Sequence, residues 1–192
     1  MNRSVGRSVV GIGFIVLMLA VLACGPLSGL TGQVQSQVQV AVDQAVTSGT
    51  TQWATSATAS SEYGAESWSA QQVLGIPDTT ECGDIETAWA TANSSGVDWI
   101  QVGYPIAVLP ARIDIYETYN PGAVVQVEVA NTSTGFSQTV YTAAEAPNDQ
   151  CPFTLSVDTS SVTQPVNQVT VHLDQTNHNG WNEIDAIGLV SQ

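Results

Sequence analysis

Residues 112–130 read RIDIYETYNPGAVVQVEVA, and this stretch indicates the fold class. Apolar and polar residues alternate in two runs: Ile113 and Ile115 share one face of the first, and Val127 and Val129 share one face of the second. A period of two is typical of β-strands that bury one face. Asn-Pro-Gly at 120–122 separates the runs and predicts a turn, because proline fixes φ and glycine accepts positive φ. The stretch therefore predicts a β-hairpin.

The same texture continues through the chain after residue 60, where short runs of β-branched and aromatic residues alternate with turn residues. Besides 112–119 and 123–130, the predicted strands are 97–104, 138–142, 153–157, 166–174 and 184–190. In the run 166–174, Val169 and Val171 share one face, so we expect His172 on the other face to meet solvent. Many short strands without a long amphipathic helix indicate an all-β fold, a sandwich of antiparallel sheets.

The N-terminus has the pattern of an export signal. Arg3 and Arg7 precede the apolar segment 9–23, and Cys24 follows it. Val-Leu-Ala-Cys at 21–24 resembles the lipobox of bacterial lipoprotein precursors, which implies lipidation of Cys24 and a location in the cell envelope, on the outer face of a membrane. Two alternatives stay open: a soluble secreted protein cut elsewhere, and an uncleaved anchor helix, for which the segment is shorter than the roughly 20 residues of a span.

Composition divides the chain into three parts. Residues 1–23 are predicted to be the lipoprotein signal peptide, residues 24–59 a lipid-anchored polar tether, and residues 60–192 the β-sandwich domain. The tether is rich in Gly, Ser, Thr, Gln and Ala and has a single acid, Asp43. A short helix and a flexible, disordered spacer both fit this composition.

Three cysteines stand at positions 24, 82 and 151. If Cys24 carries lipid, Cys82 and Cys151 are left in a compartment where thiols are oxidised, and we expect them to form a disulfide. Two free, separately buried thiols are the alternative. Without a Cys-x-x-Cys pair or a Cys/His cluster, the sequence does not indicate a zinc site.

Charge narrows the classes of partner. Seventeen acidic residues oppose three arginines and no lysine, for a formal net charge of −14, and Arg112 is the one arginine after residue 7. So acidic a surface repels phosphate backbones and anionic lipids. Nucleic acid is therefore excluded as a charge-driven partner, and contact with a membrane is expected through the lipid anchor only.

Short motifs follow one another in order through residues 60–192. They include SAQQVLGIPD at 69–78, AWA at 88–90, DWIQVGY at 98–104, IYETYNPGA at 115–123 and WNEIDAI at 181–187. This series resembles the discoidin-like, galactose-binding-like β-sandwich superfamily, and in particular the pappalysin scarf domain. The resemblance implies an eight-stranded antiparallel jelly roll that is not itself a catalyst. It also implies binding of sugars, lipid headgroups or proteins through loops at one end of the sandwich.

The resemblance also implies a place for a structural calcium. Many superfamily members hold the ion with an Asp-Gly-Asn-Pro-Asp-Thr loop and a C-terminal glutamate, but here the loop at 74–79 reads LGIPDT, with Leu74 replacing the first acidic ligand. Asp78, Asp84 and Glu183 are left to supply hard oxygen ligands, together with backbone carbonyls. The alternative is that these carboxylates are solvated or cap turns. No other cofactor is expected.

The loop Asn-His-Asn-Gly-Trp at 177–181 is the predicted ligand-contacting segment, because polar and aromatic loop residues on a β scaffold often form binding sites. The predicted contacts are Asn177, His178, Asn179 and Trp181, with Tyr119 as a further aromatic beside a loop; Tyr63 and Trp68 also flank loops. An ordinary turn with a packed tryptophan is the alternative.

Together these features favour a non-enzymatic cell-surface module that binds carbohydrate or an extracellular protein through loops of the sandwich. A structural domain that mediates protein contacts in the cell envelope is the alternative. An enzyme would need two carboxylates across one cleft, since the sequence has neither a Gly-x-Ser-x-Gly elbow nor a phosphate-binding glycine-rich loop with lysine.

Overall fold

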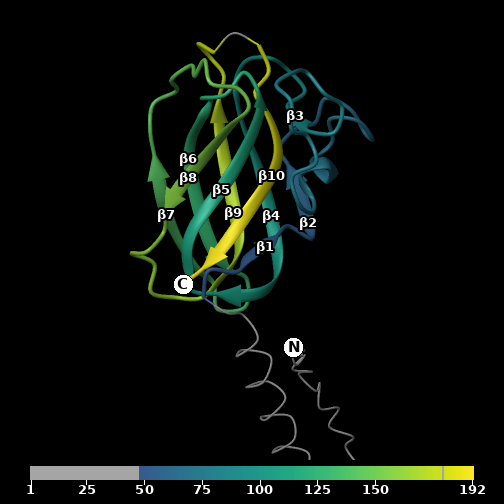
Figure 1. Ribbon diagram of the computed structural model, residues 1–192. Helices are drawn as coiled ribbons and strands as arrows, with labels where there is room; N and C mark the ends of the chain where they lie inside the picture. The colour runs from purple at the N-terminus through teal and green to yellow at the C-terminus, as the bar shows by residue number, and fades with distance from the viewer. Residues whose placement is uncertain (1–47, 179) are drawn as a thin grey trace, which may run out of the picture. The chain divides into compact units, whose positions relative to one another are not determined.

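The computed structural model describes residues 48–178 and 180–192, which form two antiparallel sheets packed face to face (Figure 1). The first sheet has the order β1-β10-β5-β8, and β3 also pairs with β10. Its strands are β1 (Thr51–Trp53), β10 (Glu183–Ser191), β5 (Pro110–Tyr119), β8 (Phe153–Asp158) and β3 (Trp89–Ala90). The second sheet comprises, in order, β2 (Ser56–Ala59), β4 (Val97–Val108), β9 (Val166–Asp174), β6 (Val124–Asn131) and β7 (Phe136–Thr142). A short 3-10 helix, η1 (Ala70–Val73), follows β2.

The all-β sandwich predicted from alternation is confirmed, and each of the predicted runs corresponds to a strand. The described residues contain ten strands rather than eight. Two of the additional strands come from the predicted tether: residues 51–53 pair with β10, and residues 56–59 pair with β4. The boundary predicted at residue 60 is therefore too late in the chain. Composition did not reveal these strands, because short edge strands are held by backbone hydrogen bonds, which polar residues also form.

The predicted signal peptide, Cys24 and most of the predicted tether lie outside the described residues. Within residues 48–178 and 180–192, no helix has the length and apolar character needed to cross a membrane.

Residues 112–130 do not form the predicted hairpin. β5 pairs with β10 and β8 in the first sheet, whereas β6 pairs with β9 and β7 in the second. The turn at 120–122 therefore carries the chain from one sheet to the other. Its carbonyls bond outward, since Pro121 O and Gly122 O accept hydrogen bonds from the amides of Asn148 and Ala146. Alternation identifies the buried face of a strand, but not its partner.

Glycine is required at position 122 of this crossing. Gly122 has φ +112°, and a Cβ there would overlap the carbonyl oxygen of Ala146. We expect Gly122→Ala to lower the free energy of unfolding by about 2 to 3 kcal/mol in urea denaturation. Gly135→Ala is the matched control, because Gly135 has φ +76° with open space around it and should lose about 1 kcal/mol. Equal losses at both positions would contradict the proposed overlap.

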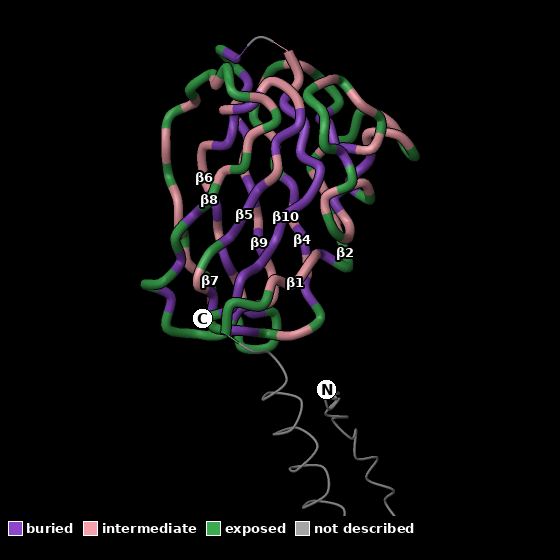
Figure 2. Tube along the Cα trace, viewed as in Figure 1, coloured by how far each residue is buried: buried purple, intermediate pink, exposed green. Residues whose placement is uncertain are grey.

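The core lies between the two sheets. Ile113 and Ile115 on β5 and Val127 and Val129 on β6 are fully buried, on the faces that the alternation predicts. β10 is buried along its whole length (Figure 2). The acidic residues near its start are therefore held out of water, which has consequences for the site described below.

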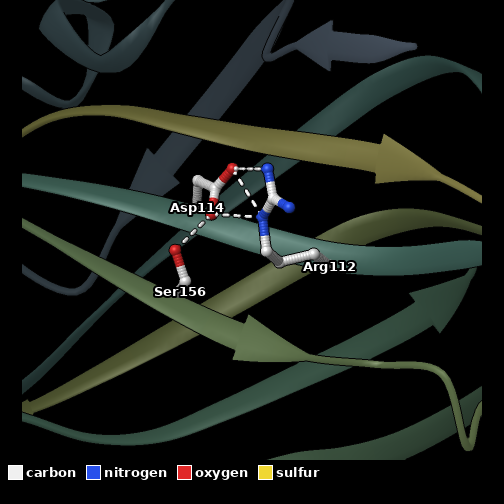
Figure 3. A network of polar contacts seen from close by, with 3 residues as sticks. All are labelled: Arg112, Asp114 and Ser156. Atoms are coloured by element: carbon white, nitrogen blue, oxygen red, sulfur yellow. Dashed lines mark hydrogen bonds and ion pairs between the residues drawn. The ribbon is translucent and has the colours of Figure 1, made fainter. Parts of the chain in front are cut away.

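The charged pairs on the outer faces of the sheets involve the basic residues of the strands. Arg112 donates from Nε and a terminal nitrogen to the Asp114 carboxylate at 2.7 and 2.9 Å, and Ser156 Oγ donates to the same carboxylate at 2.6 Å (Figure 3). His172 faces outward as predicted, with Nε2 3.6 Å from Glu128 Oε2. In register, Arg112 lies opposite Val190, near the end of β10. The one arginine of the described residues is thus already paired, far from the start of β10.

Candidate functional site

β10 begins beside β3, at the end of the sandwich away from the C-terminus (Figure 1). A pocket of about 70 Å³ is lined by residues of this region. Three aromatic residues, two acids and one alanine line it: Tyr63, Trp68, Asp84, Ala90, Trp181 and Glu183. We call it the aromatic–acidic pocket. Thr51 pairs with Val190 at the other end of β10, so β1 joins the sandwich roughly 25 Å from the pocket.

The aromatic wall is built around Tyr63. Its ring meets Trp68 edge-on with centroids 5.4 Å apart, and it meets Trp181 edge-on at 5.6 Å. Trp181 is oriented by its indole N–H, which donates to Thr91 O at 2.9 Å. Tyr63 is 55% exposed, so a large part of its side chain is open to a ligand outside the pocket.

Backbone hydrogen bonds to β3 hold the loop that carries two of these aromatics. The amide of Tyr63 donates to Ala90 O at 2.9 Å, and the amide of Ala90 donates to Trp68 O at 3.2 Å. Trp68 has φ +54°, an uncommon conformation for a bulky residue. Because β3 itself pairs with Glu183 and Ile184 of β10, the aromatic loop is fixed to the strand that carries the buried acid.

Glu183 and Asp84 form the acidic floor of the pocket and lie close enough to share a proton. Glu183 is 1% exposed, and its Oε2 accepts a hydrogen bond from the amide of Ile85 at 3.2 Å. Burial, reinforced by the neighbouring Asp84, raises the pKa of Glu183 to about 8, although the Ile85 N–H and the Trp68 indole oppose this rise. The indole Nε1 of Trp68 is buried and has no well-formed hydrogen bond.

A second carboxyl pair lies two residues further along β10. Asp185 is buried, and its Oδ2 accepts a hydrogen bond from the amide of Thr79 at 3.3 Å. Burial, followed by the nearby Asp78, raises the pKa of Asp185 to about 6. The sequence prediction missed Asp185, although the spacing of two from Glu183 on a strand was a signal that both side chains point the same way.

The two pairs divide the predicted calcium ligands. Asp78 is the acidic neighbour that acts on Asp185, whereas Asp84 is the acidic neighbour that acts on Glu183. In the described ranges, no group of three or more His, Cys, Asp or Glu side chains is arranged to hold a metal ion. Calcium takes roughly six to eight oxygens, which backbone carbonyls and waters supply together with carboxylates. Calcium binding by Asp78, Asp84 and Glu183 stays a prediction.

His178, predicted as a ligand contact, is turned into the protein. It is 2% exposed, and its Nε2 lies 2.7 Å from Asn120 O, so this nitrogen carries the proton and donates. Asn182 Nδ2 donates to Glu117 Oε2 at 2.7 Å and ties the same loop to β5. Burial raises the pKa of Glu117 despite this hydrogen bond and that from the Gly122 amide. The hydrogen bond to Asn120 therefore turns the His178 ring toward the protein interior, where it fixes the loop and does not meet solvent.

The remaining predicted contacts are spread around this end. Asn177 is exposed, with its amide 3.4 Å from Glu145 Oε2, and Asn179 lies outside the described residues. Tyr119 is half-buried beside Glu183 in register on β5, but it does not line the aromatic–acidic pocket. Of the predicted ligand contacts, the pocket contains Trp181, together with two of the predicted calcium ligands.

The sandwich of two antiparallel sheets is the architecture of discoidin-like, galactose-binding-like domains. The family model "Pappalysin-1, SD scarf domain, C-terminal" matches residues 43–192, and the chain belongs to this family. The resemblance stated from the motifs is thereby confirmed. No protein with a curated description matches the sequence significantly.

The solved structures with a similar fold include three domains of bacterial proteins. Chitosan-binding module 1 of a chitosanase/glucanase from Paenibacillus sp. IK-5 has a TM-score of 0.54 and 20% identity, with 71% of this chain and 94% of the module covered. The CpGH89CBM32-4 domain of Clostridium perfringens, in complex with glcNAc-alpha-1,4-galactose, has a TM-score of 0.52 and 12% identity, with 71% and 89% covered. The F5/8 type C domain of a Bacteroides fragilis protein has a TM-score of 0.52 and 15% identity, with 73% of this chain and 91% of that domain covered. At these identities the likeness shows the fold.

Proposed function

We propose that this protein is a non-enzymatic binding module for carbohydrate, displayed on the outer face of a bacterial membrane by a lipid at Cys24, and that the aromatic–acidic pocket is its ligand site. The observation that carries the proposal is the convergence of Tyr63, Trp68 and Trp181 with two carboxyls at one end of the sandwich. Apolar faces of sugar rings pack on aromatic side chains, while carboxylates accept hydrogen bonds from hydroxyls. Two domains of the same fold are named for chitosan and bound to a disaccharide, which supports this ligand class.

The size of the pocket defines how a sugar would bind. At about 70 Å³ it is well below the roughly 300 Å³ at which pockets begin to enclose small molecules. A ring would therefore lie against the exposed side chain of Tyr63 and insert one substituent. Shallow contact of this kind suits a sugar within a polymer.

The proposed lipid anchor is tested separately from the pocket. Feeding a tagged fatty acid to the host should label the protein, and Cys24→Ser should abolish the label. Labelling that persists in Cys24→Ser would contradict the anchor.

We assign no catalytic step to either carboxyl pair. Glycosidases hold their two carboxyls about 5 to 10 Å apart across the scissile bond. Here each pair is close enough to share a proton, which leaves no room for a sugar between its members.

The test is a glycan-array screen of the full-length chain in mild detergent, run with calcium and again with a chelator. A reproducible hit should weaken about tenfold in Tyr63→Ala and in Trp181→Ala, because each substitution removes an aromatic surface worth about 1.4 kcal/mol. Trp99→Ala is the matched control: Trp99 is an exposed aromatic on β4 outside the pocket. Chelator sensitivity would add calcium to the site.

Absence of any glycan hit under both conditions would overturn the carbohydrate proposal. It would favour the protein-contact alternative. A hit weakened equally by Trp99→Ala and by Tyr63→Ala would contradict the aromatic–acidic pocket as the ligand site. Thermal unfolding of each variant separates a lost contact from a lost fold.

A further inference from the structure

The aromatic–acidic pocket combines negative charge with a complete lack of nearby cations. Its floor consists of Glu183 and Asp84, and none of its lining residues is basic. Arg112, the one arginine or lysine among the described residues, is held by Asp114 at the other end of β10. An incoming cation would therefore meet carboxyl oxygens without competition from a basic side chain of the pocket, whereas a neutral sugar would bring no charge to complement them.

The dimensions of the pocket point to a small substituent with several donors. A primary ammonium is about the size of a water molecule and has three N–H donors, with no acceptor that a carboxylate would repel. The pocket, at about 70 Å³, accommodates such a group with one or two waters, but it does not accommodate a sugar ring.

The aromatic wall favours the same charge. Aromatic faces attract cations, most strongly for tryptophan, and the pocket is lined by Trp68, Trp181 and Tyr63. An aromatic wall above a carboxylate floor is the arrangement that recognises organic ammonium groups.

We propose that the carbohydrate taken by this pocket is an amino sugar whose free, protonated amino group enters the pocket and pairs with Glu183 and Asp84 while its ring packs on Tyr63. This inference rests on the proposed carbohydrate-binding function and narrows it to cationic sugars such as β-1,4-linked glucosamine.

The test compares two ligands that differ by acetyl groups alone: a β-1,4-linked glucosamine tetramer and its fully N-acetylated form. Titration calorimetry on the full-length chain at pH 6 should give an affinity at least about tenfold higher for the free amine. Glu183→Gln should remove this preference and leave the weak binding of the acetylated tetramer unchanged, whereas Tyr63→Ala should weaken both. Asp84→Asn, at an exposed position, is a second variant with the same expected direction.

Glu128→Gln controls for general attraction of a cation to an acidic protein, because it removes the same charge from β6, outside the pocket. The inference is overturned if the acetylated tetramer binds as tightly as the free amine, or if Glu128→Gln and Glu183→Gln weaken amine binding equally. Tight binding of neutral glycans alone would leave the proposed function standing without this inference. Absence of binding to either tetramer and to the whole array would overturn both.

Discussion

Reduction of the disulfide between Cys82 and Cys151 is expected to lower the free energy of unfolding by about 4 kcal/mol. The bond joins residues 69 positions apart. On the chain-entropy model, releasing a loop of this length gives the unfolded chain about 4 kcal/mol of additional freedom. Folded domains of this size have stabilities of roughly 5 to 15 kcal/mol, so the loss is a large part of the total.

Urea denaturation of the oxidised protein and of the same protein in a reducing agent measures this difference. The double variant Cys82→Ser/Cys151→Ser should match the reduced protein, and the reducing agent should not change it further. Coincident unfolding midpoints for oxidised and reduced protein would refute the prediction. A larger denaturant slope is also expected on reduction, because the unfolded chain becomes less compact.

The disulfide also lies next to the acidic floor of the aromatic–acidic pocket. Asp84 follows Cys82 by two residues, and the amide of Gly83 donates to Thr118 O at 3.0 Å on β5. Within the loop that precedes β3, the bond is the covalent link to the first sheet. Reduction should therefore weaken ligand binding at temperatures well below unfolding, because Asp84 loses its fixed position.

The strands were predictable because burial of one face leaves a period of two in the sequence. The pairing of strands was not, since the turn at 120–122 has the same residues whether it closes a hairpin or crosses between sheets. What decides the crossing is the segment at 146–148, which bonds to the turn from more than 20 residues away. Partners that are distant in sequence also explain why residues 51–59 were not predicted as strands. Their composition resembles a linker, but their backbones pair with β10 and β4.

The candidate site was predictable in its parts. Trp181 was identified as a loop aromatic, and Asp84 and Glu183 were identified as acids of a calcium site. Nothing local indicates that they share one pocket, because their proximity depends on the pairing of β3 with the start of β10. His178 shows the reverse error: its loop is polar in composition, but a hydrogen bond to Asn120, 58 residues away, turns the ring inward.

Replacement of Glu183 by glutamine is expected to stabilise the protein at pH 8 by about 3 kcal/mol and to have little effect at pH 4. In the folded protein burial raises the pKa of Glu183 from 4.5 to about 8. The folded state therefore binds more protons than the unfolded chain between these values, and stability falls as pH rises through that window. Each tenfold change in proton affinity is worth about 1.4 kcal/mol, and sharing of the proton with Asp84 keeps the loss below the full sum.

Urea denaturation of wild type and Glu183→Gln at half-unit steps from pH 4 to 9 measures the effect. The curves should coincide at pH 4 and separate steadily toward pH 8, while Glu128→Gln, at a half-exposed glutamate on β6, should run parallel to wild type. Asp185→Asn should separate from wild type at lower pH, since the pKa of Asp185 is raised only to about 6. Parallel curves for Glu183→Gln and wild type would exclude a raised pKa at this position.

A stability gain in Glu183→Gln bears directly on the role of the pocket. An isosteric amide keeps an acceptor for the Ile85 amide and removes the buried charge, so a selection for stability alone would favour it. Retention of an ionisable group there, at a cost to the folded state at neutral pH, is expected where the charge is used for binding. Glu183→Gln should therefore be more stable than wild type at neutral pH and should bind an amino sugar no more tightly than its N-acetylated form. Loss of that binding then could not be attributed to loss of the fold.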